Sequence, residues 1–210
     1  PISASGSWQT RSTSSAAARG AAALDPLSVV DRLNVASAAI HVARYGEAAA
    51  AAQAALALHS NLSYVEAQLC TAYAHTGRLD DARAIQARFT KANDSDDADG
   101  CAFDIAIGTL RLAAARRIVD GMAAKFSTLD LTAADMGDNY AVAGDHPNAL
   151  IWLQRGYDAK EFQVFTIGTD RAIAQSFFAE PGWKALLRQP LFKDWQAAHD
   201  KLARDLAASQ

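Results

Sequence analysis

Residues 63–94 read SYVEAQLCTAYAHTGRLDDARAIQARFTKAND, a pattern typical of two helices joined by a tight turn. Apolar residues that include Leu69 and Tyr73 fall on one face at helical spacing. Gly77 follows them, at a point where glycine readily takes the left-handed conformation that ends a helix. Two acids from Asp80 onward then open the next helix, where the positive end of the helix dipole favours them. The stretch therefore predicts a helical hairpin.

The same plan recurs along the chain with a period of 34 residues. Ala48 and Ala82 are one period apart, and each is small because two helices must approach closely there. Ala149 lies 67 residues after Ala82, one short of two periods, so a degenerate hairpin fits between them at roughly 97–125. The clear hairpins predict first helices near 29–42, 63–76 and 130–143, and second helices near 46–58, 79–92 and 146–159.

Met136-Gly137, Tyr140 and Ala149 extend this pattern, and together these motifs resemble the tetratricopeptide repeat family. The order of segments around the repeats, with 23–28 before them and 182–192 after them, resembles the C-terminal repeat region of bacterial winged-helix transcriptional activators and class III nucleotide cyclases. The resemblance implies an all-α fold, an α-solenoid of helical hairpins with a C-terminal capping helix. It also implies a module that binds proteins or peptides, although fold alone does not fix function.

Two positions depart from the family pattern. Ala39 stands where the pattern has tyrosine, and Gln86 stands where it has a large apolar residue. The predicted organisation is an arm rich in serine and threonine at 1–15, helical repeats at 16–160 and an aromatic-rich C-terminal cap at 161–210. In the last helix one stripe is formed by Phe192, Trp195, His199, Leu202 and Leu206. We interpret this helix as covering the open end of the repeats rather than as a partner-binding helix.

Composition excludes several classes of function. The chain has 20 Lys and Arg against 23 Asp and Glu, a net charge of −3, with no basic stripe for nucleic acid. No apolar run approaches the roughly 20 residues of a membrane span, so membrane insertion is not expected. The chain starts at Pro1 without an initiator methionine, which suggests a processed or excerpted form. We expect a cytoplasmic protein, or a periplasmic one if it is excerpted from a membrane-anchored protein.

Two features invite a more specific interpretation. Cys70 and Cys101 match no metal motif, and Cys70 is expected to be a buried thiol, with a disulfide between adjacent first helices as the alternative. The acidic run 94–100 resembles a calcium loop, but Ala106 stands where that loop needs a bidentate glutamate. The run is better explained as a helix N-terminus that uses aspartates for capping.

First helices line the groove in this architecture, so the 34-residue period also predicts a partner-binding groove. The groove residues are Leu33, Ser37, His41, Tyr64, Thr71, His75 and Asp138. His41 and His75 occupy the same position in consecutive hairpins, which suggests two imidazoles in one groove. The alternative is two independent histidines at helix ends, where the negative end of the dipole favours them.

No feature of the sequence supports catalysis, a cofactor or a metal site. There is no nucleophile elbow, no glycine-rich phosphate loop and no paired-histidine zinc motif. The function expected is therefore a non-enzymatic module, a scaffold or adaptor, that binds a protein or peptide in a bacterial signalling or assembly system. The alternative is a sensor domain that binds a small molecule and regulates a partner domain.

Overall fold

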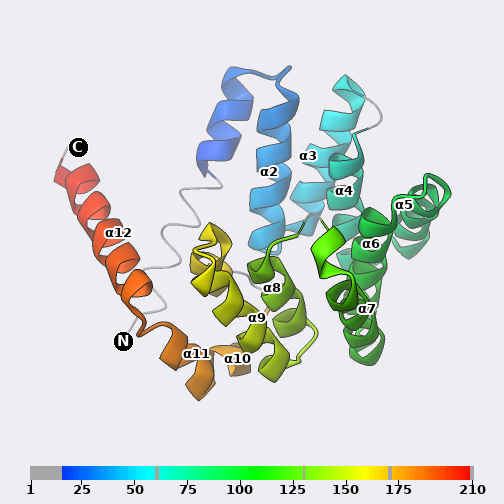
Figure 1. The fold of residues 1–210 in the computed structure, drawn as a ribbon. Coiled ribbons are helices and arrows are strands. Elements are labelled where there is room, and N and C mark those ends of the chain that lie inside the picture. The colour runs from blue at the N-terminus through cyan, green and yellow to red at the C-terminus, as the bar shows by residue number, and fades with distance from the viewer. Residues whose placement is uncertain (1–15, 60–61, 130, 170–171, 209–210) are drawn as a thin grey trace. The chain divides into compact units, whose positions relative to one another are not determined.

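The computed structural model describes residues 16–59, 62–129, 131–169 and 172–208 and is helical throughout, with no strand in these ranges (Figure 1). A helix over 16–24 comes first. It is followed by α2 (Val29–His41), α3 (Tyr45–Leu58), α4 (Ser63–His75), α5 (Leu79–Lys91), α6 (Ser95–Gly108), α7 (Leu112–Ala124), α8 (Ala133–Val142) and α9 (His146–Asp158). Short helices η1 (Phe126–Thr128), η2 (Phe162–Phe165), η3 (Ile167–Thr169), α10 (Gln175–Ala179) and α11 (Pro181–Leu186) and a longer α12 (Pro190–Ala208) complete the order.

The predicted helices of the clear hairpins are confirmed to within about three residues at every end. The largest difference is at α8, which starts at Ala133 rather than near 130. Thr132 explains it, because Thr132 and Asp135 form a capping box: the Thr132 hydroxyl accepts from the Asp135 N–H, and the Asp135 carboxylate accepts from the Thr132 N–H. The arm predicted at 1–15 lies outside the described residues.

A regular series of left-handed residues marks the turn inside each hairpin. Ala43, Gly77, Leu110 and Gly144 have φ of 57°, 78°, 57° and 74°, at successive intervals of 34, 33 and 34 residues. The residue after each donates its N–H to a carbonyl five residues back, as in Arg44 to Ala39, the bond that closes a helix in the Schellman motif. The series places the degenerate hairpin at α6 and α7 and shows that the missing residue falls between Gly77 and Leu110.

Small residues occupy the close approach of each hairpin. Ala48, Ala82 and Ala149 are buried, as predicted, and Ala115 is the buried equivalent in the degenerate hairpin. Each N–H bonds to the residue that precedes its helix, so the four alanines sit in the same first turn. A larger side chain there would force the paired helices apart.

The chain forms two compact units, which we treat separately. Unit 1 holds the residues up to Leu131 together with 169–172, and unit 2 holds the remainder from Thr132, so the boundary lies inside the region predicted as repeats. In unit 1, α2 packs on α3, α4 on α5 and α6 on α7, and the first helices α2, α4 and α6 also contact one another in turn. We call α2, α4 and α6 the first-helix layer. The unit 1 core contains many alanines, with larger side chains such as Leu69, Ile85 and Phe89 between them.

A disulfide joins Cys70 on α4 to Cys101 on α6, with the two Cα atoms 5.8 Å apart. Cys70 is buried, as predicted, but the expected free thiol is wrong, because the alternative pairing between adjacent first helices is what the structure contains. Both sulfurs lie close to the carbonyl oxygen of Ala82, at 3.6 and 3.5 Å. The bond therefore lies at the centre of α4, α5 and α6.

Unit 2 is built on a close crossing of α8 and α9. A Cβ on Gly137 would lie 2.6 Å from the Leu153 side chain, so only glycine fits there. Glu161, just after α9, folds back to the start of α8, where its two carboxylate oxygens accept from Ala133 N at 3.1 Å and Ala134 N at 2.8 Å. A negative charge at this end also stabilises the helix dipole.

Aromatic rings hold the C-terminal segment onto this pair. Tyr157 of α9 stacks on Phe192 of α12, with ring centroids 5.8 Å apart, and its hydroxyl accepts from Leu191 N at 3.0 Å. Phe165 contacts both Phe192 and Trp195. These contacts anchor the start of α12 within unit 2, and the capping of the repeats by this segment stays a prediction. The side chains of His199, Leu202 and Leu206, the rest of the predicted stripe, lie outside the described part of α12.

Candidate interaction surface on the first helices

The left-handed turns fix which residues of successive first helices are equivalent. Counting from them, Ser37, Thr71, Asp104 and Asp138 occupy one position in α2, α4, α6 and α8. We call Ser37, Thr71 and Asp104, the three that lie in unit 1, the polar column. Ser37, Thr71 and Asp138 were predicted as groove residues, and Asp104 was missed because the register of the degenerate hairpin was not known from sequence.

Hydrogen bonds join neighbouring helices of the first-helix layer at this column. The Thr71 hydroxyl donates to the Asp104 carboxylate at 2.5 Å, across the seam between α4 and α6. One seam earlier, the Gln68 amide of α4 donates to the Ser37 hydroxyl of α2 at 2.6 Å. Gln68 is 8% exposed, and its carbonyl oxygen is buried with no hydrogen-bond partner among the described residues. The column is thus an ordered, partly buried polar line rather than a set of independent surface groups.

His75 lies at the C-terminal end of α4, beside the same carboxylate. Its Nε2 is 3.9 Å from Oδ1 of Asp104, and its ring stacks on Tyr45 with centroids 4.2 Å apart. The side chains of His75 and Asp104 retain 15% and 22% of their exposure. Thr71, His75, Asp104 and Tyr45 therefore form one cluster drawn from α3, α4 and α6, with a carboxylate near its centre.

The remaining predicted groove residues have different surroundings. Leu33 is half-buried and packs against the core, and its place in a groove stays a prediction. Tyr64 is 60% exposed at the start of α4, and His41 is exposed at the end of α2. Asp138 is half-buried in α8, and so belongs to unit 2. The structure thus brings Thr71 and His75 together, while the pairing of His41 with His75 stays a prediction.

Tyr45 of the cluster and Gln68, which bonds to Ser37, were not predicted as site residues. Tyr45 is the first residue of α3, and nothing in its position distinguishes it from an ordinary hairpin residue. Gln68 was hidden because it stands among apolar residues on the buried side of α4. Asp104 alone had a usable signal, since it lies 33 residues after Thr71 and the chain is one residue short of two periods at Ala149.

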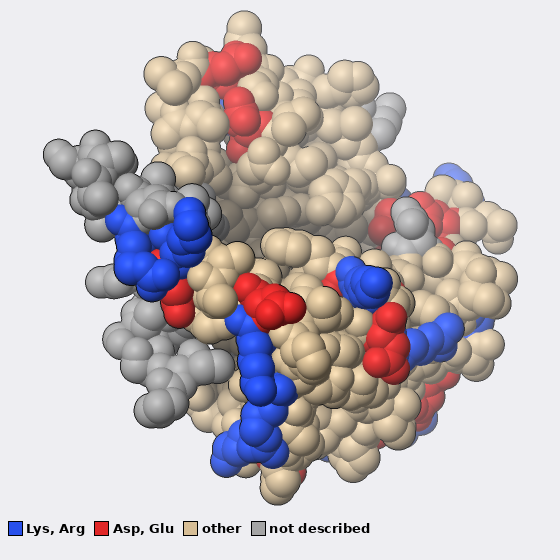
Figure 2. Space-filling view, turned by 60° about the vertical axis from the view of Figure 1, so that its left-hand side comes forward, with Lys and Arg blue, Asp and Glu red and all other residues tan. Residues whose placement is uncertain are grey.

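Charge is divided unequally between the two kinds of helix in unit 1. The first-helix layer carries six acids, Asp31, Glu66, Asp96, Asp97, Asp99 and Asp104, against a single arginine, Arg32. The second helices α3, α5 and α7 carry four acids and five Lys or Arg. Figure 2 shows both acidic and basic side chains on the face in view.

Some of these acids already pair with cations from outside the layer. Arg88 of α5 lies 2.9 Å from Glu66, and Lys125, just after α7, lies 2.9 Å from Asp99 and 3.6 Å from Asp96. Asp104 contacts Thr71 and His75 of the layer itself.

The acidic run 94–100 is a helix start, as interpreted from sequence. Asp94 caps α6, its carboxylate accepting from the Asp97 N–H at 3.3 Å. Burial, and then the neighbouring Asp94, raise the pKa of Asp97 above its ordinary value. Across the described ranges, no three His, Cys, Asp or Glu side chains converge as a metal site would require. No helix among them is long and apolar enough to cross a membrane.

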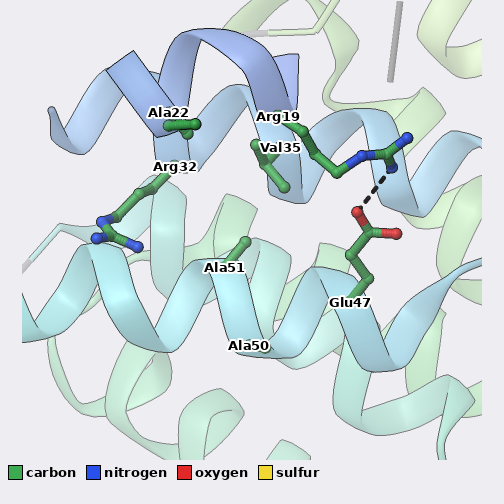
Figure 3. A pocket seen from close by; sticks show the side chains of 8 residues that line it. Arg19, Ala22, Arg32, Val35, Glu47, Ala50 and Ala51 are labelled. Carbon is green, nitrogen blue, oxygen red and sulfur yellow. Dashed lines mark hydrogen bonds and ion pairs between the residues drawn. The ribbon is translucent and has the colours of Figure 1, made fainter. Parts of the chain in front are cut away.

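A separate open cavity lies between the 16–24 helix, α2 and α3 (Figure 3). Its volume is about 450 Å³. Ala22, Ala23, Val35, Ala50 and Ala51 give it apolar walls, and Arg19, Arg32 and Glu47 supply its charges. An ion pair of 3.0 Å between Arg19 and Glu47 links the 16–24 helix to α3 beside it.

Comparisons of the chain with models of known protein families, with curated proteins and with solved structures give no match. The candidate sites therefore stand on their own geometry.

Proposed function

We propose that the protein is a non-enzymatic binding module, a tetratricopeptide-type α-solenoid, which docks a protein or peptide partner along the first-helix layer. The observation that carries this proposal is the polar column, in which Ser37, Thr71 and Asp104 occupy equivalent positions on three helices packed side by side. Side chains repeated at one register offer evenly spaced hydrogen-bonding groups to an extended chain. The resemblance of the repeats adds the expectation of a bacterial signalling or assembly system.

The chemistry of the layer favours a partner rich in Lys and Arg. Some family members capture a C-terminal carboxylate through Lys, Arg and Asn in the groove. That set is absent here apart from Asn34, and the layer offers hydroxyls and carboxylates with Arg32 as its one arginine. Acceptors of this kind pair with N–H donors and cations, and charge-assisted hydrogen bonds are about twice as strong as neutral ones. A basic segment is therefore the occupant that the layer complements.

The test is a binding measurement with three labelled peptides of equal length, rich in Lys and Arg, rich in Glu, and uncharged. Fluorescence anisotropy with the full chain should show binding of the basic peptide, weakened between about 50 and 500 mM salt because surface charges are screened. Equal affinity for the three peptides, or a preference for the acidic one, would contradict the proposal. Loss of binding in an Asp104→Asn variant would place the site on the first-helix layer.

The cavity beside the 16–24 helix favours a second candidate, a sensor that binds a small molecule. Its volume and its apolar walls with a few charged groups suit a small ligand. A panel of metabolites screened by thermal shift should then contain a compound that raises the melting temperature, since a ligand bound only to the folded state stabilises it. Ala50→Phe, at an exposed position on the wall, should abolish that shift, and Ala57→Phe, exposed elsewhere on α3, should leave it unchanged.

A further inference from the structure

The two cysteines of this chain are well placed for the disulfide that joins them. The protein has two cysteines and no others, so no competing pairing exists within a molecule. Their Cα atoms are 5.8 Å apart, in the middle of the range that a disulfide spans without movement of the backbone. Both residues lie inside helices, on α4 and α6, whose positions are fixed by many other contacts.

The disulfide occupies a position that is held by another kind of link one repeat earlier. Counting from the left-handed turns, Cys70 is equivalent to Ala36 and Cys101 is equivalent to Gln68. At the seam between α2 and α4, Gln68 bonds to Ser37, next to Ala36. At the seam between α4 and α6, the covalent bond stands in the corresponding place. Each seam of the first-helix layer is thus joined at the same height.

The surroundings explain why a covalent link matters in this unit. The core is rich in alanine, including Ala72 and Ala74 on α4 and Ala82 and Ala98 on its neighbours. Each alanine buries little apolar area, so packing contributes less free energy here than in a core of leucine and phenylalanine. A cross-link that closes a separation of 31 residues offsets this by restricting the unfolded chain.

We propose that Cys70 and Cys101 are oxidised in the functional protein, which therefore matures in an oxidising compartment, the periplasmic alternative of the sequence analysis. The inference does not depend on the partner or on the binding proposal. Structural disulfides of this kind form and persist outside the reducing cytosol. At 0% and 2% exposure, the two residues are also protected from exchange once the helices have packed.

Burial sets the order of events. A thiolate of one cysteine attacks an external disulfide, either of an oxidoreductase or of a small molecule, and releases one external thiol. The second cysteine then attacks the mixed disulfide, forming the Cys70–Cys101 bond and releasing the second external thiol. Two protein thiols are oxidised, and one external disulfide is reduced to two thiols. Because reagents cannot reach sulfurs buried among α4, α5 and α6, the exchange precedes the packing of these helices.

The first experiment is mass spectrometry of the full chain, produced in an oxidising compartment, denatured and alkylated without reductant. The expected result is a monomer that takes up no alkyl group, and that takes up two after reduction. Two alkylated thiols before reduction, or a dimer linked between molecules, would overturn the proposal.

The second experiment compares the melting temperatures of the oxidised and the fully reduced protein, which differ by the bond alone. The oxidised form should melt roughly 10 °C higher, as expected for a loop of this size in a chain of this length. The Cys70→Ala, Cys101→Ala double variant should show no dependence on reductant. Failure of the reduced protein to fold would support the proposal, and equal melting temperatures would overturn it.

Discussion

The hydroxyl of Thr71 donates a hydrogen bond of 2.5 Å to Asp104, which lies 33 residues later at the equivalent position of the next first helix. Because the two residues occupy equivalent positions, this bond shows that residues one repeat apart in the sequence are in contact in the structure. It also holds the one carboxylate of the polar column in unit 1 at a fixed place. The predictions below begin with this pair.

Asp104→Asn should weaken the binding of a basic peptide about tenfold, because it removes one charge-assisted hydrogen bond to the partner. Asparagine can still accept from Thr71, so the free energy of unfolding should change by less than about 1 kcal/mol. Anisotropy titrations and urea denaturation measure the two effects. Asp120→Asn on α7 makes the same change of charge on a second helix, and equal loss in both variants would argue against the first-helix layer.

Ala82→Leu should destabilise the protein by about 1–3 kcal/mol, because the added atoms have no room at the close approach of α4 and α5. Ala82 is fully buried, and its carbonyl lies beside both sulfurs of the disulfide. Midpoints of urea denaturation measure the change. The control is Ala84→Leu, two residues further on the exposed side of α5. If Ala82→Leu had the same midpoint as the wild type, the register of the hairpins would be incorrect.

Gly108→Ala and Gly121→Ala should have opposite effects on stability. A Cβ on Gly108 would lie 2.4 Å from the carbonyl oxygen of Ala74, so α6 would have to move away from α4, at a cost of about 1–3 kcal/mol. A Cβ on Gly121, inside α7, meets nothing within 4 Å. Alanine there should stabilise by about 0.5–1 kcal/mol through helix propensity. Denaturation curves of the two variants check the pair, and stabilisation by both would refute the close contact.

Asp97→Asn should raise the free energy of unfolding at pH 7. Burial and the nearby Asp94 raise the pKa of Asp97, so ionising this carboxyl costs more in the folded protein than in the unfolded chain. The cost is present above the folded pKa and vanishes below the ordinary value of about 3.9. The gain from asparagine should therefore be seen at pH 7 and be absent at pH 3.

Asp99→Asn provides the control for this pH dependence. It makes the same change two residues away, but Asp99 is engaged by Lys125 at 2.9 Å. No stabilisation is expected from its replacement. Equal behaviour of the two variants across pH would show that the environment of Asp97 is not distinct.

The sequence was sufficient to predict the helices, because glycines, helix-start acids and buried alanines recur at fixed spacing. Ala48, Ala82 and Ala149 were found by spacing alone and are all buried. The degenerate hairpin was located, but its exact register was not predicted. Its turn has Leu110 in the left-handed conformation, at the position where two other turns have Gly77 and Gly144. A leucine in that conformation costs free energy and has no sequence signature.

The site was predicted less completely, because it depends on which side chains meet across helices. Thr71 and His75 could be placed on one helix by periodicity, but their contacts with Asp104 and Tyr45 follow from the packing of α3, α4 and α6. For the same reason, the disulfide was predicted only as the alternative to a buried thiol. The two cysteines are 31 residues apart, which is not a multiple of the repeat, so they do not occupy equivalent positions in α4 and α6. That these two positions face each other follows only from the packing of the helices.

The left-handed turns also define a segment of the chain that can be duplicated. Ala43 and Gly77 have the same backbone conformation one period apart, so the segment from Arg44 to Gly77 begins and ends on matching backbone. A duplicate of this cassette inserted after Gly77 would join like geometry to like at both splice points. Cys70 should be kept only in the copy beside α6 and replaced in the other copy by alanine, the residue found at the equivalent Ala36. The insertion should then give an array that is longer by one hairpin, and repeated insertions should lengthen it in equal steps.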